Sequence, residues 1–270
     1  MKLKINLYGN AFLHNLVDGQ ISSTPNQVPN DIEFVIDGSG DVNLFVDSGI
    51  YEIKEFDKSK KNYAWLCEST AIRPDIYKYF FEDTTTKIAP FEKIFTFNDN
   101  LLQINSKFEF VHPSGLWVKS DINLEKSELI SMITSDKKQT PLQKKRVKFA
   151  KKNKNKIDLF GNGFNYIEKK EEGLQKYCYS FAFENDDTNS YFSEKILDCF
   201  AMKTIPIYKG TRNIQNFFNK DGIIFFDEFK FKDLTFENYK NKLKAVNENF
   251  DLVREYRIPE DIIYKKIVSR

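Results

Sequence analysis

The segment from residue 177 to residue 208 reads YCYSFAFENDDTNSYFSEKILDCFAMKTIPIY. Residues 177–183 form an apolar run of the length of a buried strand, and residues 191–202 carry apolar side chains at helical spacing. A second apolar run follows at 204–208. Strand–helix–strand units with short connections form parallel strands, and the connecting helix covers a face of the sheet. The segment therefore predicts a parallel α/β sheet.

The same alternation extends toward both ends of the chain. Turn residues cluster at 112–115, where we expect the boundary between two α/β halves. We predict a first domain over 1–118, a second over 119–257, and a C-terminal helix over 258–270 that packs back on the first domain. The other expected strands are 4–8, 33–37, 43–47, 63–67, 94–97, 129–134, 156–160 and 222–226, and the other expected helical segments are 74–81, 98–103, 141–152, 169–175 and 236–257.

Composition and charge exclude several classes of protein. The 270 residues are 41% hydrophobic and 30% charged, which supports packed cores. The net charge of +2 is far below that of a dedicated nucleic-acid binder. With two histidines, three widely spaced cysteines and no apolar run of eighteen residues, the chain predicts neither a zinc site nor a transmembrane segment. Unpaired thiols and the lack of a signal peptide favour the cytoplasm.

The expected helix at 141–152 carries an arginine where an apolar residue would be usual. Between residues 137 and 156 there are ten lysines or arginines and no acidic residue, and five of the lysines lie on the solvated side of this helix. Arg146 instead lies at the centre of the apolar face. An unpaired buried guanidinium is costly, so Arg146 needs either a carboxylate partner or an anionic ligand. The residues alone leave both open. The apolar face consists of Leu142, Phe149 and Ala150.

The expected helix at 191–202 is also amphipathic. Tyr191, Glu194, Lys195 and Asp198 fall on its polar side. Glu194 and Lys195 lie in the first turn, and a helix N-terminus favours anions. An anion site and an ordinary solvated Glu/Lys face are both compatible with this pattern.

Three motifs with fixed spacing resemble the family-ten glycosyltransferases, the α-fucosyltransferases. They are Phe-Glu-Asn at 183–185, Tyr-Phe-Ser-Glu-Lys at 191–195 and Ile-Pro-Ile-Tyr-Lys-Gly at 205–210. The family carries Tyr-x-Thr-Glu-Lys in the second motif, so Ser193 departs from it but keeps the hydroxyl. The resemblance covers most of residues 60–230. It implies a GT-B fold, with two Rossmann-like domains facing a cleft, the first on the acceptor side and the second binding the donor.

The resemblance also implies roles for individual residues in the donor domain. Arg146 and Lys195 match the residues that contact the donor diphosphate, and Glu194 matches the glutamate that holds the ribose hydroxyls. Asn185 and Tyr191 match other donor-site positions. The remaining expected donor-site residues are Glu184 of the Phe-Glu-Asn motif, Gly161 at a strand end, and Ser135, for which a plain turn serine is the alternative.

One residue of the first half has an expected catalytic role. Glu68 directly follows the apolar run 63–67, which places it at the carboxyl end of a strand. The family's catalytic glutamate occupies the same kind of position. A sugar transferase needs a base near the attacking hydroxyl, and a carboxylate is the usual solution. We therefore expect Glu68 to be the general base.

Together these features predict an inverting glycosyltransferase that moves L-fucose from GDP-fucose to a hydroxyl of a glycan acceptor. We expect no cofactor and no metal, since Asp186-Asp187 is the nearest approach to an Asp-x-Asp metal site and is interpreted as a loop. We expect no nucleic-acid partner. The alternatives are a transferase of the same fold that uses another nucleotide sugar, and a non-catalytic nucleotide- or RNA-binding protein.

Overall fold

The computed structural model describes residues 2–55, 59–119 and 124–269. It divides the chain into two compact units. The first unit comprises Met1–Gly115, Asn189–Tyr191 and Ile258–Arg270, and the second comprises Leu116–Thr188 and Phe192–Arg257. The change of unit at Gly115 lies within the predicted turn cluster and three residues before the domain boundary drawn from the sequence.

The first unit contains a six-stranded sheet in which every pair of neighbouring strands is parallel. The strand order is β4-β1-β5-β6-β7-β8. Two short antiparallel strands form a separate hairpin that the sequence did not reveal. The bounds are β1 Leu3–Tyr8, β2 Leu16–Val17, β3 Gln20–Ile21, β4 Ile32–Val35, β5 Val42–Val46, β6 Asn62–Leu66, β7 Lys93–Thr96 and β8 Phe108–Phe110.

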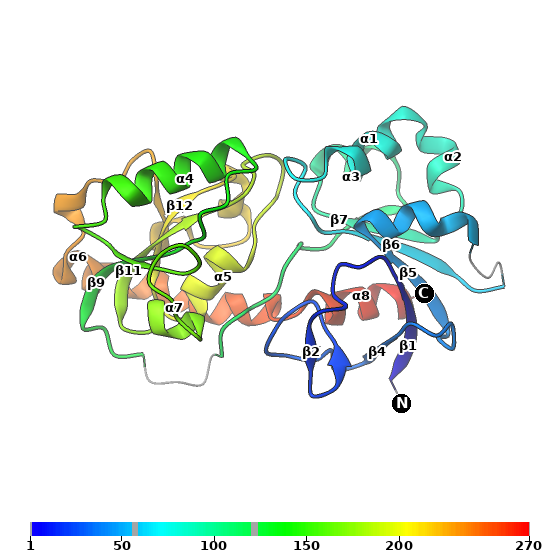
Figure 1. The fold of residues 1–270 in the computed structure, drawn as a ribbon, viewed down its shortest axis with the longest axis horizontal. Coiled ribbons are helices and arrows are strands. Elements are labelled where there is room, and N and C mark those ends of the chain that lie inside the picture. Colours follow the sequence, from blue (N-terminus) through cyan, green and yellow to red (C-terminus); the bar gives the residue numbers. More distant parts are fainter. Residues whose placement is uncertain (1, 56–58, 120–123, 270) are drawn as a thin grey trace. The chain divides into compact units, whose positions relative to one another are not determined.

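Alternate residues of the central strands enter two separate cores. In β6, Ala64 and Leu66 pack with α1, whereas Tyr63 and Trp65 pack with Ile263 of α8. The period of two residues follows from strand geometry. Both faces of this parallel sheet are therefore covered, with α1 and α3 on one face and α8 on the other (Figure 1). The helical bounds are η1 Asp47–Glu55, α1 Pro74–Glu82, α2 Thr84–Ile88, α3 Asp99–Ile104 and α8 Pro259–Val268.

The second unit contains a five-stranded sheet, again with all neighbouring strands parallel. The strand order is β10-β9-β11-β12-β13. The predicted fold class, two parallel α/β units, is confirmed. The strand bounds are β9 Glu128–Ile133, β10 Asp158–Phe160, β11 Tyr177–Phe183, β12 Ile205–Lys209 and β13 Ile224–Phe225. The helical bounds are α4 Pro141–Lys152, η2 Lys170–Gly173, α5 Glu194–Ala201, η3 Arg212–Asn216, η4 Lys220–Gly222, η5 Phe231–Asp233, α6 Phe236–Asn241, α7 Leu243–Leu252 and η6 Val253–Tyr256.

Local capping explains why one expected helix of this unit is exact and another is not. Helix α4 has the predicted bounds because Thr140 and Gln143 form a capping box around Pro141. Helix α5 is shorter than the predicted 191–202. Ser193 caps it with an extended backbone, so the residues before Ser193 lie outside the helix. The predicted helix at 169–175 is only a short 3-10 turn.

In each sheet, the strand that comes first in the sequence lies between the strands that come second and third. In the first unit β1 lies between β4 and β5, and in the second unit β9 lies between β10 and β11. The strand order therefore reverses at β1 and at β9. Open parallel sheets bind ligands at the carboxyl ends of the strands beside such a reversal. Functional side chains are therefore expected at the carboxyl ends of the strands, which we call the carboxyl edge of each sheet.

Candidate donor-binding site

A fully buried carboxylate connects the end of β11 to the start of α5. Glu184 directly follows β11 and has no exposed surface. Its carboxylate accepts hydrogen bonds from the Ser193 backbone N–H at 2.9 Å and the Ser193 hydroxyl at 2.6 Å. A Cβ atom on Gly210 would clash first with the end of the Tyr208 ring and would also lie 2.9 Å from Cγ of Glu184, so a larger residue at position 210 would press on both side chains. The first and third sequence motifs thus support the second, which begins α5.

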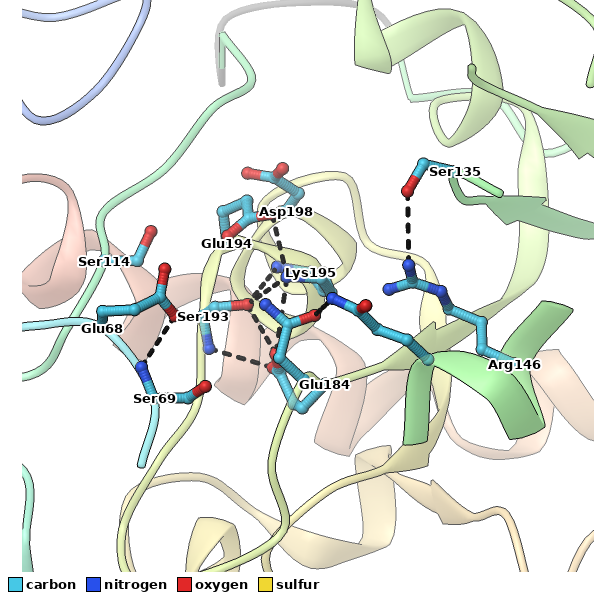
Figure 2. A network of polar contacts seen from close by, with 12 residues as sticks. Glu68, Ser69, Ser114, Ser135, Arg146, Glu184, Ser193, Glu194, Lys195 and Asp198 are labelled. Atoms are coloured by element: carbon cyan, nitrogen blue, oxygen red, sulfur yellow. Dashed lines mark hydrogen bonds and ion pairs between the residues drawn. The ribbon is translucent and has the colours of Figure 1, made fainter. Parts of the chain in front are cut away.

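Lys195 and Glu194 lie in the first turn of α5, as expected (Figure 2). Lys195 Nζ is 2.9 Å from the Ser193 hydroxyl, 3.2 Å from Glu194 and 3.7 Å from Glu184. Burial opposes the ionisation of Glu194, but Lys195 and Lys170 outweigh it and lower its pKa to about 2. Glu194 is therefore ionised at neutral pH. The alternative of an ordinary solvated Glu/Lys face is wrong, because the side chains of Glu194 and Asp198 are 12% and 2% exposed.

Lys170 belongs to this cluster although the sequence did not single it out. Its Nζ lies 2.9 Å from Asp198 and 3.4 Å from Glu194, and 4.4 Å from the centroid of the Trp117 ring. Asp198 also accepts the Trp117 backbone N–H at 2.8 Å. Burial raises the pKa of Asp198 to about 6, an effect that Lys170 partly offsets. Lys170 sits in a short turn without helical periodicity, so no sequence pattern distinguishes it from the many exposed lysines.

Arg146 points from α4 toward the loop after β9. It is 5% exposed, and its Nη2 lies 3.3 Å from the Ser135 hydroxyl (Figure 2). Its buried Nε has no hydrogen-bond partner, and among the described residues no carboxylate lies within 4.0 Å of its guanidinium. Burial lowers the pKa of Arg146, although Glu184 and Glu194 act in the opposite direction. An arginine side chain nevertheless stays charged. Of the two partners that the sequence left open, a carboxylate is therefore not the one found in the described part of the chain.

Asn185 and Gly161 each have a structural role that the sequence did not show. The Asn185 side-chain oxygen accepts a hydrogen bond from Gln143 at 3.1 Å, and Gln143 also belongs to the capping box of α4. Gly161 has a φ of +106°, and a Cβ atom there would lie 2.3 Å from the Thr134 carbonyl. Its close neighbour is thus the residue that directly follows β9. The donor-site roles of both residues stay predictions.

Ser135, Gly161 and Glu184 follow β9, β10 and β11, so they share the carboxyl edge of the second sheet. This is the edge at which the strand order reverses. Two cations, on Arg146 and Lys195, belong to the helices that follow β9 and β11. The edge combines a buried guanidinium, an ammonium at a helix N-terminus and an ionised carboxylate. The two cations of such a set can bind a polyanion. The carboxylate can accept hydrogen bonds from hydroxyl groups.

In the first unit, Glu68 lies two residues beyond the end of β6 and is half-buried. One of its carboxylate oxygens accepts the Ser69 backbone N–H at 2.7 Å. The Tyr77 hydroxyl donates to the Glu68 carbonyl oxygen at 2.6 Å. The backbone and the side chain of Glu68 are thus both held at the carboxyl edge of the first sheet.

Tyr191 lies apart from the helical face predicted for it. It precedes α5 and packs in a core cluster of the first unit, where its ring meets Phe97 edge-to-face at 5.0 Å. The prediction that it shares a side of a helix with Glu194 and Lys195 is wrong, because Ser193 begins that helix. A role of Tyr191 in donor binding stays a prediction.

The described residues contain neither a cluster of metal-binding side chains nor a membrane-spanning helix. No group of three or more histidine, cysteine, aspartate or glutamate side chains there could hold a metal ion. Asp186 accepts both the backbone N–H and the hydroxyl of Thr188, as in a loop. None of the helices in the described part of the chain is long and apolar enough to cross a membrane.

Comparison with known proteins places this site in a family context. Residues 123–258, half of the chain, match the family model of the C-terminal part of glycosyltransferase family 10 (fucosyltransferase). The alpha-(1,3)-fucosyltransferase FucT of Helicobacter pylori is 31% identical over 93 residues. That match covers 34% of this chain and about a fifth, 19%, of the length of the relative.

Solved structures extend the likeness to nearly the whole chain. A crystal structure of an alpha1,3-fucosyltransferase covers 99% of this chain and 87% of its own, with a TM-score of 0.51 and 16% identity. The structure of an alpha1,3-fucosyltransferase with GDP-fucose covers 99% of this chain and 88% of its own, with a TM-score of 0.50 and 16% identity. At this level of identity the likeness concerns the fold.

Proposed function

Because the chain belongs to glycosyltransferase family 10, we propose that it transfers L-fucose from GDP-fucose to a hydroxyl of a glycan, with inversion at the anomeric carbon. The observation that carries this proposal is the buried guanidinium of Arg146, which has no carboxylate partner among the described residues. A buried cation is stable only with a compensating anion. A donor diphosphate would supply that anion at the carboxyl edge of the second sheet.

The diphosphate also gives the two cations a role in the reaction. When the bond between the sugar and GDP breaks, the leaving phosphate gains negative charge. Arg146 and Lys195 are already positioned to stabilise this charge, so no rearrangement is needed. Because Arg146 presents its N–H groups in a fixed plane, it can donate two parallel hydrogen bonds to a phosphate. The hydroxyl of Ser135, 3.3 Å from Arg146, adds a neutral donor beside the same position.

Glu194 is suited to a different part of the donor. Its pKa of about 2 keeps it a carboxylate at neutral pH, and an ionised carboxylate is an acceptor only. The two vicinal hydroxyls of a ribose present two donors to such a group. Lys170 and Lys195 hold the carboxylate from two sides, at 3.4 Å and 3.2 Å. We therefore assign Glu194 to the ribose of the nucleotide.

Glu68 of the first unit would act as the general base. The acceptor oxygen forms a bond to the anomeric carbon as the bond from that carbon to the β-phosphate oxygen breaks. Glu68 takes up the proton that the hydroxyl loses, and GDP leaves with the bonding electron pair. A positioned base of this kind contributes roughly 10²–10⁴-fold to the rate. One displacement from the opposite face inverts the anomeric centre.

The donor site is tested by calorimetry with GDP. Arg146→Ala and Lys195→Ala should each weaken GDP affinity by about 10- to 150-fold, the effect of losing a charge-assisted hydrogen bond. Lys148→Ala on the exposed face of α4 removes a lysine that the site does not use, and should bind GDP like the wild type. Wild-type affinity in both site variants would contradict the assignment, as would a wild-type protein that binds no GDP.

The identity of the sugar is tested separately. The family description and the name of the Helicobacter pylori relative support fucose. Thermal-shift titrations with a panel of GDP-, UDP- and CDP-linked sugars should show the largest stabilisation with GDP-fucose, because a ligand that binds the folded state raises the melting temperature according to its affinity. A larger shift with another nucleotide sugar would favour a transferase of the same fold with a different donor.

A further inference from the structure

An aspartate at the carboxyl edge of the first sheet holds the backbone that carries Glu68. Asp47 directly follows β5, the strand beside the reversal of strand order. It is 8% exposed. One of its oxygens accepts the backbone N–H of Cys67 at 2.9 Å and that of Glu68 at 3.1 Å. The other oxygen lies 3.1 Å from the Cys67 thiol. All three donors of this clamp come from a segment twenty residues further along the chain.

The backbone of Asp47 is held in a conformation that L-residues rarely adopt. Its φ is +47°, in the left-handed region, which asparagine and aspartate tolerate better than most residues. The adjoining turn is packed against the end of β1. A Cβ atom on Gly49 would lie 2.4 Å from the Tyr8 carbonyl, and one on Gly9 would lie 2.5 Å from the Val46 carbonyl. These close contacts fix the turn and so fix the direction of the Asp47 carboxylate.

We propose that Asp47 is a positioning residue for the general base: its carboxylate sets the orientation of the Glu68 backbone and thereby aims the Glu68 side chain. This inference rests on the proposed role of Glu68. Two N–H groups converging on one oxygen fix the planes of the peptides that precede Cys67 and Glu68. The Tyr77 hydroxyl fixes the next carbonyl. The direction of the Cα–Cβ bond of Glu68 then follows from its backbone.

The rate depends on such positioning because a base must lie within hydrogen-bond reach of the proton it takes. A misplacement of about 1 Å can cost on the order of 10²-fold in rate. GDP affinity should not depend on it, since Arg146, Lys195 and Glu194, which we assign to GDP, belong to the second unit. The inference therefore predicts a loss in kcat without a loss in GDP affinity.

Two substitutions of Asp47 separate the clamp from the backbone conformation. Asp47→Gly removes the carboxylate but readily adopts a positive φ. Asp47→Asn keeps a carbonyl oxygen for both N–H groups and also tolerates the left-handed region. Each variant is assayed on the glycan that gives the highest wild-type turnover in an array screen with GDP-fucose. We expect kcat to fall by about 10- to 100-fold in Asp47→Gly and to stay within a few-fold of the wild type in Asp47→Asn.

Asp18→Gly is the matched control. Asp18 is also left-handed, with a φ of +49°, but it is exposed in the turn between β2 and β3. Its replacement changes the same residue type in the same conformation without touching the clamp. Its kcat should equal that of the wild type. Tyr77→Phe provides an independent variant, because it removes the hydrogen bond to the Glu68 carbonyl and should lower kcat while leaving GDP affinity unchanged.

The outcomes distinguish this inference from the proposed function. Wild-type kcat in Asp47→Gly, together with an inactive Glu68→Gln, overturns the positioning role and leaves the base in place. Equal losses in Asp47→Asn and Asp47→Gly also overturn it, because the retained oxygen would then have no effect. A fully active Glu68→Gln instead refutes the proposed base. If Asp47→Gly does not fold, wild-type kcat in Tyr77→Phe overturns the inference.

Discussion

Asp47 in the first unit and Glu184 in the second occupy the same topological position. Asp47 directly follows β5, which pairs with β1, the first strand of its sheet. Glu184 directly follows β11, which pairs with β9, the first strand of the second sheet. Each is buried, and each accepts from a later segment, Asp47 two backbone N–H groups and Glu184 one. Burial raises the pKa of both carboxyl groups.

The two sheet edges differ in the charges around these carboxylates. Lys195 lies 3.7 Å from Glu184, and Arg146 and Lys170 belong to the same unit. Among the described residues, no cation lies within 4.0 Å of Asp47, whose neighbours are a thiol and the backbone of Glu68. In the proposed reaction, the cations of the second sheet would bind the donor anion, and the carboxylate of Glu68 at the first sheet would take up a proton. The same topology would then serve two chemical tasks, because the side chains after equivalent strands differ.

The largest expected effect tests this division of tasks. Glu68→Gln keeps the shape of the side chain but removes its basicity. We expect the transfer rate to fall by about 10²–10⁴-fold and GDP affinity, measured by calorimetry, to stay unchanged. By contrast, Lys195→Ala should clearly lower GDP affinity. If Glu68→Gln binds GDP more weakly by the same factor as Lys195→Ala, the tasks are not divided between the two units.

A somewhat smaller effect compares two carboxylates that clamp a serine in the same way. Glu184 accepts the N–H and hydroxyl of Ser193, and Glu260 of the first unit accepts the N–H at 2.7 Å and hydroxyl at 2.7 Å of Ser23. Replacing either with alanine leaves two buried donors unpaired and should lower the free energy of unfolding by about 2–4 kcal/mol, measured by urea denaturation. Only Glu184→Ala should also weaken GDP binding, because only Glu184 borders Lys195. Equal GDP affinities in the two variants would contradict this comparison.

The smallest effect concerns the pH dependence of the charged cluster in the second unit. The pKa of Asp198 is raised from 3.8 to about 6, so between these values the folded protein binds a proton that the unfolded chain does not. The free energy of unfolding should therefore rise as pH falls from about 6 to about 4, by about 1–3 kcal/mol. The pKa of Glu194 is lowered from 4.5 to about 2, so its contribution is lost as pH falls below about 4.5.

Asp198→Asn isolates the first of these two trends. Urea denaturation between pH 4 and pH 7 should show a smaller gain on acidification in Asp198→Asn than in the wild type. The difference between the two profiles cancels the contributions of carboxyl groups that do not interact with Asp198. Parallel profiles would mean that Asp198 titrates in the folded protein as it does in the unfolded chain.

Much of the fold was readable from the sequence because its strands are buried on both faces. Parallel strands of this kind appear as continuous apolar runs, and β11 lies exactly at the predicted 177–183. Helix α4 was equally clear, because Thr140, Pro141 and Gln143 give a complete N-terminal signal. The short elements β8 and α2 were missed, since three to five residues carry too little periodicity to distinguish them from loops.

Residues of the candidate site divide in the same way. The sequence by itself identified Glu184, Glu194 and Lys195 as candidate donor-site residues, because their motifs are close along the chain. It also placed Arg146 on the inward face of its helix. Only the tertiary structure decided that Arg146 has no carboxylate partner among the described residues and that Lys170 joins Glu194. The sequence also did not predict the left-handed backbone of Asp47 or its hydrogen bonds to the Glu68 segment. The physical reason is that periodicity records which side of an element is buried, whereas a hydrogen bond between segments twenty residues apart depends on the packing of the whole sheet.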